Sequence, residues 1–111
     1  MSCHLLDIGH FCVVHLLYKG VCLLRFRSSA FEHGIEAEQV HEVIANKWEM
    51  TKWFKIHDDI HGNSQDMIVG FDANGNLIEI GLTYIDNDEI IFHADHVTPA
   101  WTEIYNKNRL N

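Results

Sequence analysis

The sequence predicts a single α+β domain, and three local patterns carry this prediction. Apolar residues recur at helical spacing over residues 35–46, which is the pattern of an amphipathic helix. Further along, two alternating apolar–polar segments flank Asn74-Gly75, a pair that favours a tight hairpin because it tolerates positive φ. Thr98-Pro99 predicts a second helix, since threonine is a good N-cap and proline suits the first helical position. We expect one helix packed on a four-stranded antiparallel sheet, with a short C-terminal helix.

Length and composition also fit one domain. The chain has 111 residues, of which 47% are hydrophobic and 22% are charged, as is typical of folded globular proteins. A chain of this size can bury one modest core but not two. We therefore expect a single folded domain over residues 25–111, which needs no partner to complete its core.

Residues 1–24 differ from the rest of the chain. They contain all three cysteines and only two charged side chains, Asp7 and Lys19. We predict an apolar N-terminal extension that packs on the domain as a strand or helix; one interpretation is that it is translated from upstream of the true start. A signal peptide would need a basic region first, and a membrane span would need roughly 18 uninterrupted apolar residues. We expect no membrane partner.

The three cysteines predict the compartment. Their number is odd, and no export signal precedes them, which favours reduced thiols in the cytoplasm. The spacings between them match no zinc motif. We expect a cytoplasmic protein whose N-terminal cysteines hold no metal.

The first element of the domain is a helix over Ile35–Asn46. Gly34 is expected to form the turn into it, while Glu36 and Glu38 suit the positive end of the helix dipole. Its apolar face consists of Ala37, Val40, Val43 and Ile44.

The remaining elements are strands and a final helix. The strands are expected at Trp48–Ile56, Met67–Phe71, Leu77–Ile85 and Glu89–Ala94. A polar loop, 57–66, separates the first two strands, and Asp86-Asn87-Asp88 forms the last turn. The final helix is expected over Pro99–Asn106.

Three short motifs carry a resemblance to a known family. They are His33-Gly34-Ile35 at the start of the first helix, the strand pair around Asn74-Gly75, and His93-Ala94 at the end of the last strand. In this order and spacing, the region from Phe31 to Tyr105 resembles the BrnT-like toxins of the RelE/ParE superfamily. The resemblance implies a RelE/ParE-like fold and a type II toxin encoded beside an antitoxin. In many relatives the toxin is an endoribonuclease that cuts RNA without metal.

Such cleavage needs a base for the ribose 2′-hydroxyl, an acid for the leaving oxygen and cations for the developing charge. The resemblance places His93 as the acid or base; the simpler alternative is a strand-end histidine bonded to backbone. Family members commonly carry an arginine directly after the strand-ending alanine. Here that position is Asp95, an anion where a phosphate clamp is expected.

Other candidates supply charge and stacking. Lys52 and Lys55 are expected to assist catalysis, and Arg27, His33 and Trp53 to bind RNA. The alternative is that the lysines are solvated strand residues beside a half-buried tryptophan, and that His33 only satisfies its turn.

Two histidine-rich segments raise the question of a metal. Residues 57–61 and 93–96 each supply two histidines and at least one carboxylate, which are ligand types for zinc or manganese. They would converge only if the 57–66 loop folded over the end of the last strand. Acidic loops that contain histidine are usually solvated, so we expect no metal and no cofactor.

The charge balance leaves two function classes open. The formal net charge is −8, whereas proteins that grip RNA usually present a basic face. One class is an endoribonuclease-type toxin, and the other is a catalytically silent domain of the same fold that binds a protein. In both we expect a cognate antitoxin and no direct contact with DNA; RNA is the substrate in the first.

Overall fold

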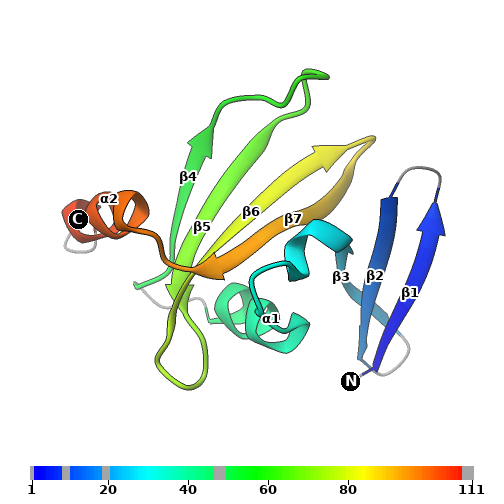
Figure 1. Ribbon diagram of the computed structural model, residues 1–111, viewed down its shortest axis with the longest axis horizontal. Helices are drawn as coiled ribbons and strands as arrows, with labels where there is room; N and C mark the ends of the chain where they lie inside the picture. The colour runs from blue at the N-terminus through cyan, green and yellow to red at the C-terminus, as the bar shows by residue number, and fades with distance from the viewer. Residues whose placement is uncertain (1, 9–10, 19–20, 47–49, 109–111) are drawn as a thin grey trace.

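The computed structural model describes the backbone of residues 2–8, 11–18, 21–46 and 50–108, and the side chains of 25–46 and 50–108. The elements, shown in Figure 1, are β1 (Ser2–Ile8), β2 (Phe11–Tyr18), β3 (Val21–Arg27), the 3₁₀ helix η1 (Ser28–Phe31), α1 (Ala37–Ala45), β4 (Lys52–Ile56), β5 (Gln65–Phe71), β6 (Leu77–Ile85), β7 (Asp88–His96) and α2 (Pro99–Asn108).

The described strands form one mixed sheet in the order β1-β2-β3-β7-β6-β5-β4. The α+β class is confirmed, and β4 to β7 pair antiparallel in chain order, as predicted. The prediction of a purely antiparallel, four-stranded sheet was wrong, because β3 pairs in parallel with β7 through Arg25 opposite Ile90 and Phe26 opposite Ile91. A parallel pair needs a long crossover, and α1 with β4 to β6 supplies it.

The N-terminal segment forms strands. Residues 1–24, predicted as an extension, contribute β1, β2 and the first part of β3, so the expected boundary before Arg25 falls inside a strand. Phe26, the residue after Arg25, is fully buried. The side chains of residues 1–24, and with them the predictions for the cysteines, lie outside the described residues.

The start of α1 explains why the helix is shorter than predicted. Glu36 is the N-cap and forms a capping box with Gln39, in which the backbone N–H of Glu36 donates to Gln39 Oε1 at 2.8 Å. Gly34 enters this turn with φ of +80°. Ile35 therefore precedes the helix, yet it is buried in the same core as Val40, which is the arrangement of a hydrophobic staple.

Each face of the sheet carries a helix (Figure 1). On the first face, Val40 and Val43 of α1 join a core with Ile68, Ile80 and other side chains from β3, β5, β6 and β7. The second face holds a smaller core of Met67, Val69 and Tyr105, with Trp101 and other side chains packed against it. Tyr105 lies on α2, so this helix covers the β4–β5 side of the second face.

The hairpin turns differ from the expected geometry. At Asn74-Gly75 only the glycine has positive φ, +82°, as in a hairpin loop in which a turn is followed by a glycine bulge. Positive φ at two successive residues occurs instead at Asp86 (50°) and Asn87 (70°), between β6 and β7. These two residues match the mirror-image turn that suits the twist of paired strands.

Most element bounds lie close to the prediction. β6 spans Leu77–Ile85 as expected, whereas β5 and α2 are each longer than predicted by two residues and β7 by three. β4 begins at Lys52 rather than Trp48, and residues 47–49 lie outside the described chain. Met50 precedes the strand, where its carbonyl accepts a hydrogen bond from Tyr105 Oη at 2.5 Å. Among the described residues, no helix has the length and apolarity needed to cross a membrane.

Candidate functional site

A β-bulge on β7 shapes the candidate site. The register between β6 and β7 shifts after Gly81, which lies opposite His93, while Leu82 lies opposite Ile91. Phe92 is the extra residue of this bulge. A Cβ atom on Gly81 would lie 2.6 Å from Phe92 Cζ, so the missing side chain leaves room for the ring. His93 and Asp95 then lie on the same face of β7, since alternate strand residues share a face.

Glu79 is a buried carboxylate with both oxygens in use. It lies opposite Asp95 on the neighbouring strand, and only 3% of its surface is exposed. Its Oε2 lies 2.8 Å from His93 Nε2, and its Oε1 accepts a hydrogen bond of 2.6 Å from the backbone N–H of Thr98. A buried charge is stable only when partnered, and Glu79 has a partner on each side.

His33 reaches the same place from another part of the chain. Ser29 Oγ donates to the Phe92 carbonyl at 2.6 Å, which holds η1 against β7 and positions the loop that follows. The imidazoles of His33 and His93 meet edge-on, with ring centroids 5.5 Å apart and an interplanar angle of 68°. His33 Nδ1 lies 3.7 Å from Asp95 Oδ2, so a protonated His33 forms an ion pair there.

The four side chains form one cluster, which we call the histidine–carboxylate site: His33, Glu79, His93 and Asp95. The side chain of His33 is 44% exposed and that of His93 is 27% exposed, so both imidazoles can reach a ligand from solvent. Imidazoles held beside carboxylates are side chains of the kind that act as general bases and acids. Of the residues predicted from sequence, the structure brings His33 and His93 together here.

The predicted lysines and Trp53 lie elsewhere. They are on β4, which β5 and β6 separate from β7, a backbone distance of roughly 14 Å at normal strand spacing. Lys52 and Lys55 also face opposite sides of the sheet, because they are three positions apart on one strand. Trp53 is half exposed and lies on the same side as Lys55. The structure does not bring these three residues to His93.

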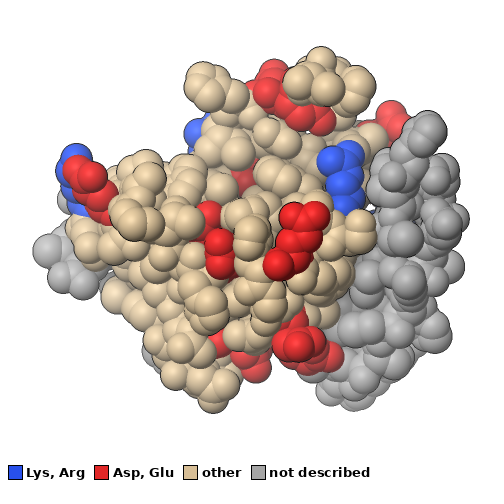
Figure 2. All heavy atoms as spheres, viewed as in Figure 1, with Lys and Arg blue, Asp and Glu red and all other residues tan. Residues whose placement is uncertain are grey.

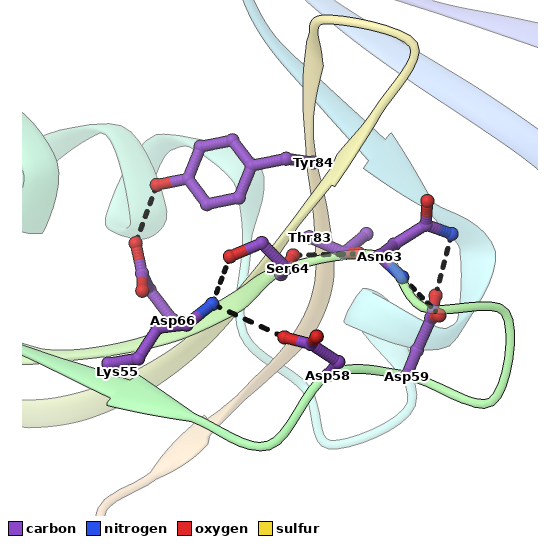
Figure 3. Close-up of polar contacts among 8 residues, drawn as sticks. All are labelled: Lys55, Asp58, Asp59, Asn63, Ser64, Asp66, Thr83 and Tyr84. Carbon is purple, nitrogen blue, oxygen red and sulfur yellow. Dashed lines mark hydrogen bonds and ion pairs between the residues drawn. The ribbon is translucent and has the colours of Figure 1, made fainter.

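Lys55 is part of a polar network at the β4–β5 loop (Figure 3). Its ammonium group contacts Ser64 Oγ and lies 3.5 Å from Asp58 Oδ1. On the neighbouring strand β6, Tyr84 Oη donates to Asp66 Oδ2 of β5 at 2.6 Å. Burial, together with the hydrogen bond and the charge of Asp66, raises the pKa of Tyr84 above its usual range. These contacts fasten the loop to the sheet.

Arg27 ends β3, where it pairs with Val13 of β2 and is half-buried. Its neighbour Arg25 forms an ion pair with Asp88 at the start of β7. The prediction that Arg27 takes part in RNA binding receives no direct support from these positions.

The two histidine-rich segments lie at opposite ends of β6. The loop over residues 57–64 adjoins the C-terminal end of β6, where the Tyr84 N–H donates to the Ser64 carbonyl at 3.0 Å. His96, by contrast, pairs with Ile78 near the N-terminal end of β6. The convergence that a metal site would need therefore does not occur. Within the described part of the chain, no group of three or more His, Cys, Asp or Glu side chains is arranged to hold a metal ion.

Sequence reasoning missed Glu79. It alternates with Ile78 and Ile80 on a strand, which normally indicates a solvent-facing residue. The second face is partly covered, however, so Glu79 is buried beside Val69 and opposite Asp95. No pattern within the strand itself distinguishes a buried Glu79 from a solvent-facing one.

The surface around these elements is acidic. On the face shown in Figure 2, Asp and Glu side chains lie at the top, near the middle and in the lower part, and Lys and Arg cover less of it. Such a surface repels polyanions at long range and attracts basic segments.

Comparison with known proteins found no match to this chain, whether among family models, curated proteins or solved structures.

Proposed function

We propose that this chain is a toxin-like, RelE/ParE-like component of a type II toxin–antitoxin pair, and that it acts in the cytoplasm as a metal-independent endoribonuclease. One observation carries the proposal: His33 and His93, from distant parts of the sequence, lie with their ring centroids 5.5 Å apart. The resemblance had named both residues. Their proximity provides the two proton-transfer groups that RNA cleavage without metal requires.

In the proposed reaction, His93 is the base. It takes the proton of a ribose 2′-hydroxyl; the O2′–phosphorus bond forms and the phosphorus–O5′ bond breaks. Glu79 stabilises the imidazolium that results, as a buried carboxylate does in a catalytic triad. His33 is the acid and gives its proton to the leaving O5′ atom. The products are a 2′,3′-cyclic phosphate and a free 5′-hydroxyl, and solvent then restores both histidines.

The proposal changes the expected roles of the other residues. Because Lys52 and Lys55 lie across the sheet on β4, the positive charge beside the phosphate comes from the His33 imidazolium. Asp95 opposes phosphate binding at this position. Modest activity is the expected consequence.

A second candidate function is favoured by the acidic balance of the chain. The side chain of Asp95 is partly exposed at the site, and the chain has a net charge of −8. A catalytically silent domain would use this surface to bind a basic segment of an antitoxin or of another protein. A neighbouring reading frame that encodes a small DNA-binding protein would support a toxin–antitoxin pair under either candidate.

Induced expression tests the proposal directly. Wild type should arrest growth, whereas His93→Ala and His33→Ala should not. His96→Ala is the matched control, since His96 is an exposed histidine of the same strand outside the cluster. The purified proteins should rank in the same order in cutting RNA at low salt with a chelator present. A folded wild-type protein that neither arrests growth nor cuts RNA would end the nuclease proposal and favour the partner-binding domain.

A further inference from the structure

We infer that Glu79 is a positioning residue that fixes His93 in the tautomer with hydrogen on Nε2, so that Nδ1 is the nitrogen that takes the proton. The assignment of Nδ1 as the reacting atom rests on the proposed nuclease function. The assignment of the tautomer does not, because it follows from the hydrogen bonds of Glu79 alone.

One carboxylate oxygen of Glu79 faces the start of α2. Glu79 Oε1 lies 2.6 Å from the Thr98 backbone nitrogen, and a backbone N–H can only donate. Thr98 directly precedes Pro99, whose nitrogen carries no hydrogen, so Thr98 provides the donor at the start of α2. This contact fixes the orientation of the carboxylate and commits Oε1 as an acceptor.

The other carboxylate oxygen of Glu79 faces His93. Glu79 Oε2 lies 2.8 Å from His93 Nε2, and an ionised carboxylate only accepts. The hydrogen of this bond therefore belongs to Nε2. If the pair takes up one more proton, an imidazole is more basic than a carboxylate, and Nε2 still carries hydrogen. In the neutral ring the lone pair is then on Nδ1, which has no hydrogen-bond partner among the residues that the structure describes.

Glu79→Gln should reverse this arrangement without changing the size of the side chain. The amide oxygen must accept from Thr98, since the amide NH₂ cannot. The NH₂ group then faces His93 Nε2 and requires an acceptor there. The ring meets this requirement by moving its hydrogen to Nδ1. Both hydrogen bonds of residue 79 are kept, but Nδ1 then carries hydrogen and can no longer act as the base.

Nitrogen NMR measures the tautomer. In ¹⁵N-labelled full-length protein at alkaline pH, long-range ¹H–¹⁵N correlation distinguishes protonated from unprotonated ring nitrogens. Wild-type His93 should show protonated Nε2 and unprotonated Nδ1, and Glu79→Gln should show the reverse. Glu103→Gln is the control, because Glu103 is an exposed residue of α2, 71% accessible. The His93→Ala spectrum identifies the His93 signals.

RNA cleavage by the same samples tests the role of Nδ1. Glu79→Gln should lower the rate at saturating RNA by roughly 10²- to 10⁴-fold, as tautomer inversion does in a catalytic triad, with little change in KM. Glu103→Gln should cut as wild type does.

The outcomes separate the two proposals. The positioning role is overturned if wild-type His93 carries hydrogen on Nδ1. It is also overturned if the protonation of the two ring nitrogens is unchanged in folded Glu79→Gln. The wild-type spectrum decides the tautomer even if the variant fails to fold. If Glu79→Gln reverses the protonation of the two ring nitrogens but cuts RNA as fast as wild type, Nδ1 is not the base. Hydrogen on Nε2 in a wild type that cuts no RNA upholds the tautomer and rejects the nuclease function.

Discussion

Asp59 and Asp72 occupy the same position in two turns that make the same hydrogen bonds. The backbone N–H of each aspartate donates to the carbonyl four residues later, that of Asn63 at 2.9 Å and that of Asn76 at 3.0 Å. Each carboxylate accepts from the backbone N–H and the side-chain amide of that asparagine. Both segments read Asp-x-x-Gly-Asn. One short sequence pattern therefore closes both the β4–β5 and the β5–β6 connections.

Asp72→Ala is expected to cost more stability than Asp59→Ala. Asp72 is 4% exposed and also accepts a hydrogen bond from Gln39 Nε2 of α1 at 3.1 Å, whereas Asp59 is only half-buried. Leaving buried donors without an acceptor costs about 1–3 kcal/mol. Urea unfolding of the two variants measures the difference. Equal midpoints would mean that the bond to α1 contributes nothing.

Stability should also fall in acid through Asp72. Burial works against its ionisation, but hydrogen bonds from Asn76, Gln39 and Asn74 outweigh burial and hold the pKa of Asp72 below its usual range. The contribution is therefore present above the unfolded pKa, about 3.9, and is lost as the pH falls through the folded value. Asp72→Asn should unfold at lower urea than wild type at pH 7, and the two midpoints should converge below about pH 4. A constant gap across this range contradicts the prediction.

Gly75→Val is expected to destabilise the β5–β6 hairpin. Gly75 has φ of +82°, where a β-branched residue is strained, at a cost on the order of 1 kcal/mol or more. Gly75→Asn should cost less, because asparagine tolerates this region. Denaturation midpoints of the two variants test the order. If valine and asparagine behave alike, backbone conformation does not explain the glycine.

Deletion of β1 and β2 should leave the rest of the domain folded. A chain that begins at Val21 keeps β3 and the fully buried Phe26, so it should retain a cooperative thermal transition. A chain that begins at Ser28 lacks Phe26, and the loss of a buried aromatic side chain alone costs about 3–5 kcal/mol. Circular dichroism during heating compares the two. An unfolded Val21 chain would show that β1 and β2 are essential to the core.

Asp95→Arg should raise RNA cleavage if the nuclease proposal holds. The substitution replaces an anion 3.7 Å from His33 Nδ1 with a cation that can hold the developing phosphate charge, a gain of up to about 10²-fold. Asp58→Arg makes the same charge change at the exposed β4–β5 loop and serves as the control. An equal rise in both variants would point to general attraction for RNA rather than to the site.

Local patterns determined how much of the fold was predictable. The helix over α1 and the strand β6 follow from periodicity, which depends on neighbouring residues only. The pairing of β3 with β7 joins distant segments, and no periodicity within Val21–Arg27 specifies its partner or its direction. The repeated Asp-x-x-Gly-Asn pattern was legible in the sequence, and it would have placed a turn at Asp59 within the polar loop.

The candidate site was less predictable than the fold. Sequence reasoning selected His93 and His33 through the resemblance, but it grouped Lys52 and Lys55 with them. Strand spacing and alternation separate the lysines, and both depend on the order of strands in the sheet. Glu79 was missed because its burial follows from the register with β5 and β7, which single-strand patterns do not encode.

The parallel pairing of β3 with β7 has a consequence for synthesis on the ribosome. Ser29, which follows β3, bonds to Phe92, 63 positions later in the chain. At about 5–20 residues per second, that length takes roughly 3–13 s to translate. During this interval β1, β2 and β3 can pair only with one another, and the edge of β3 that β7 will occupy stays open to other chains. The nascent chain therefore passes through a period in which an open strand edge waits for its partner. The length of the crossover sets how long this edge stays open.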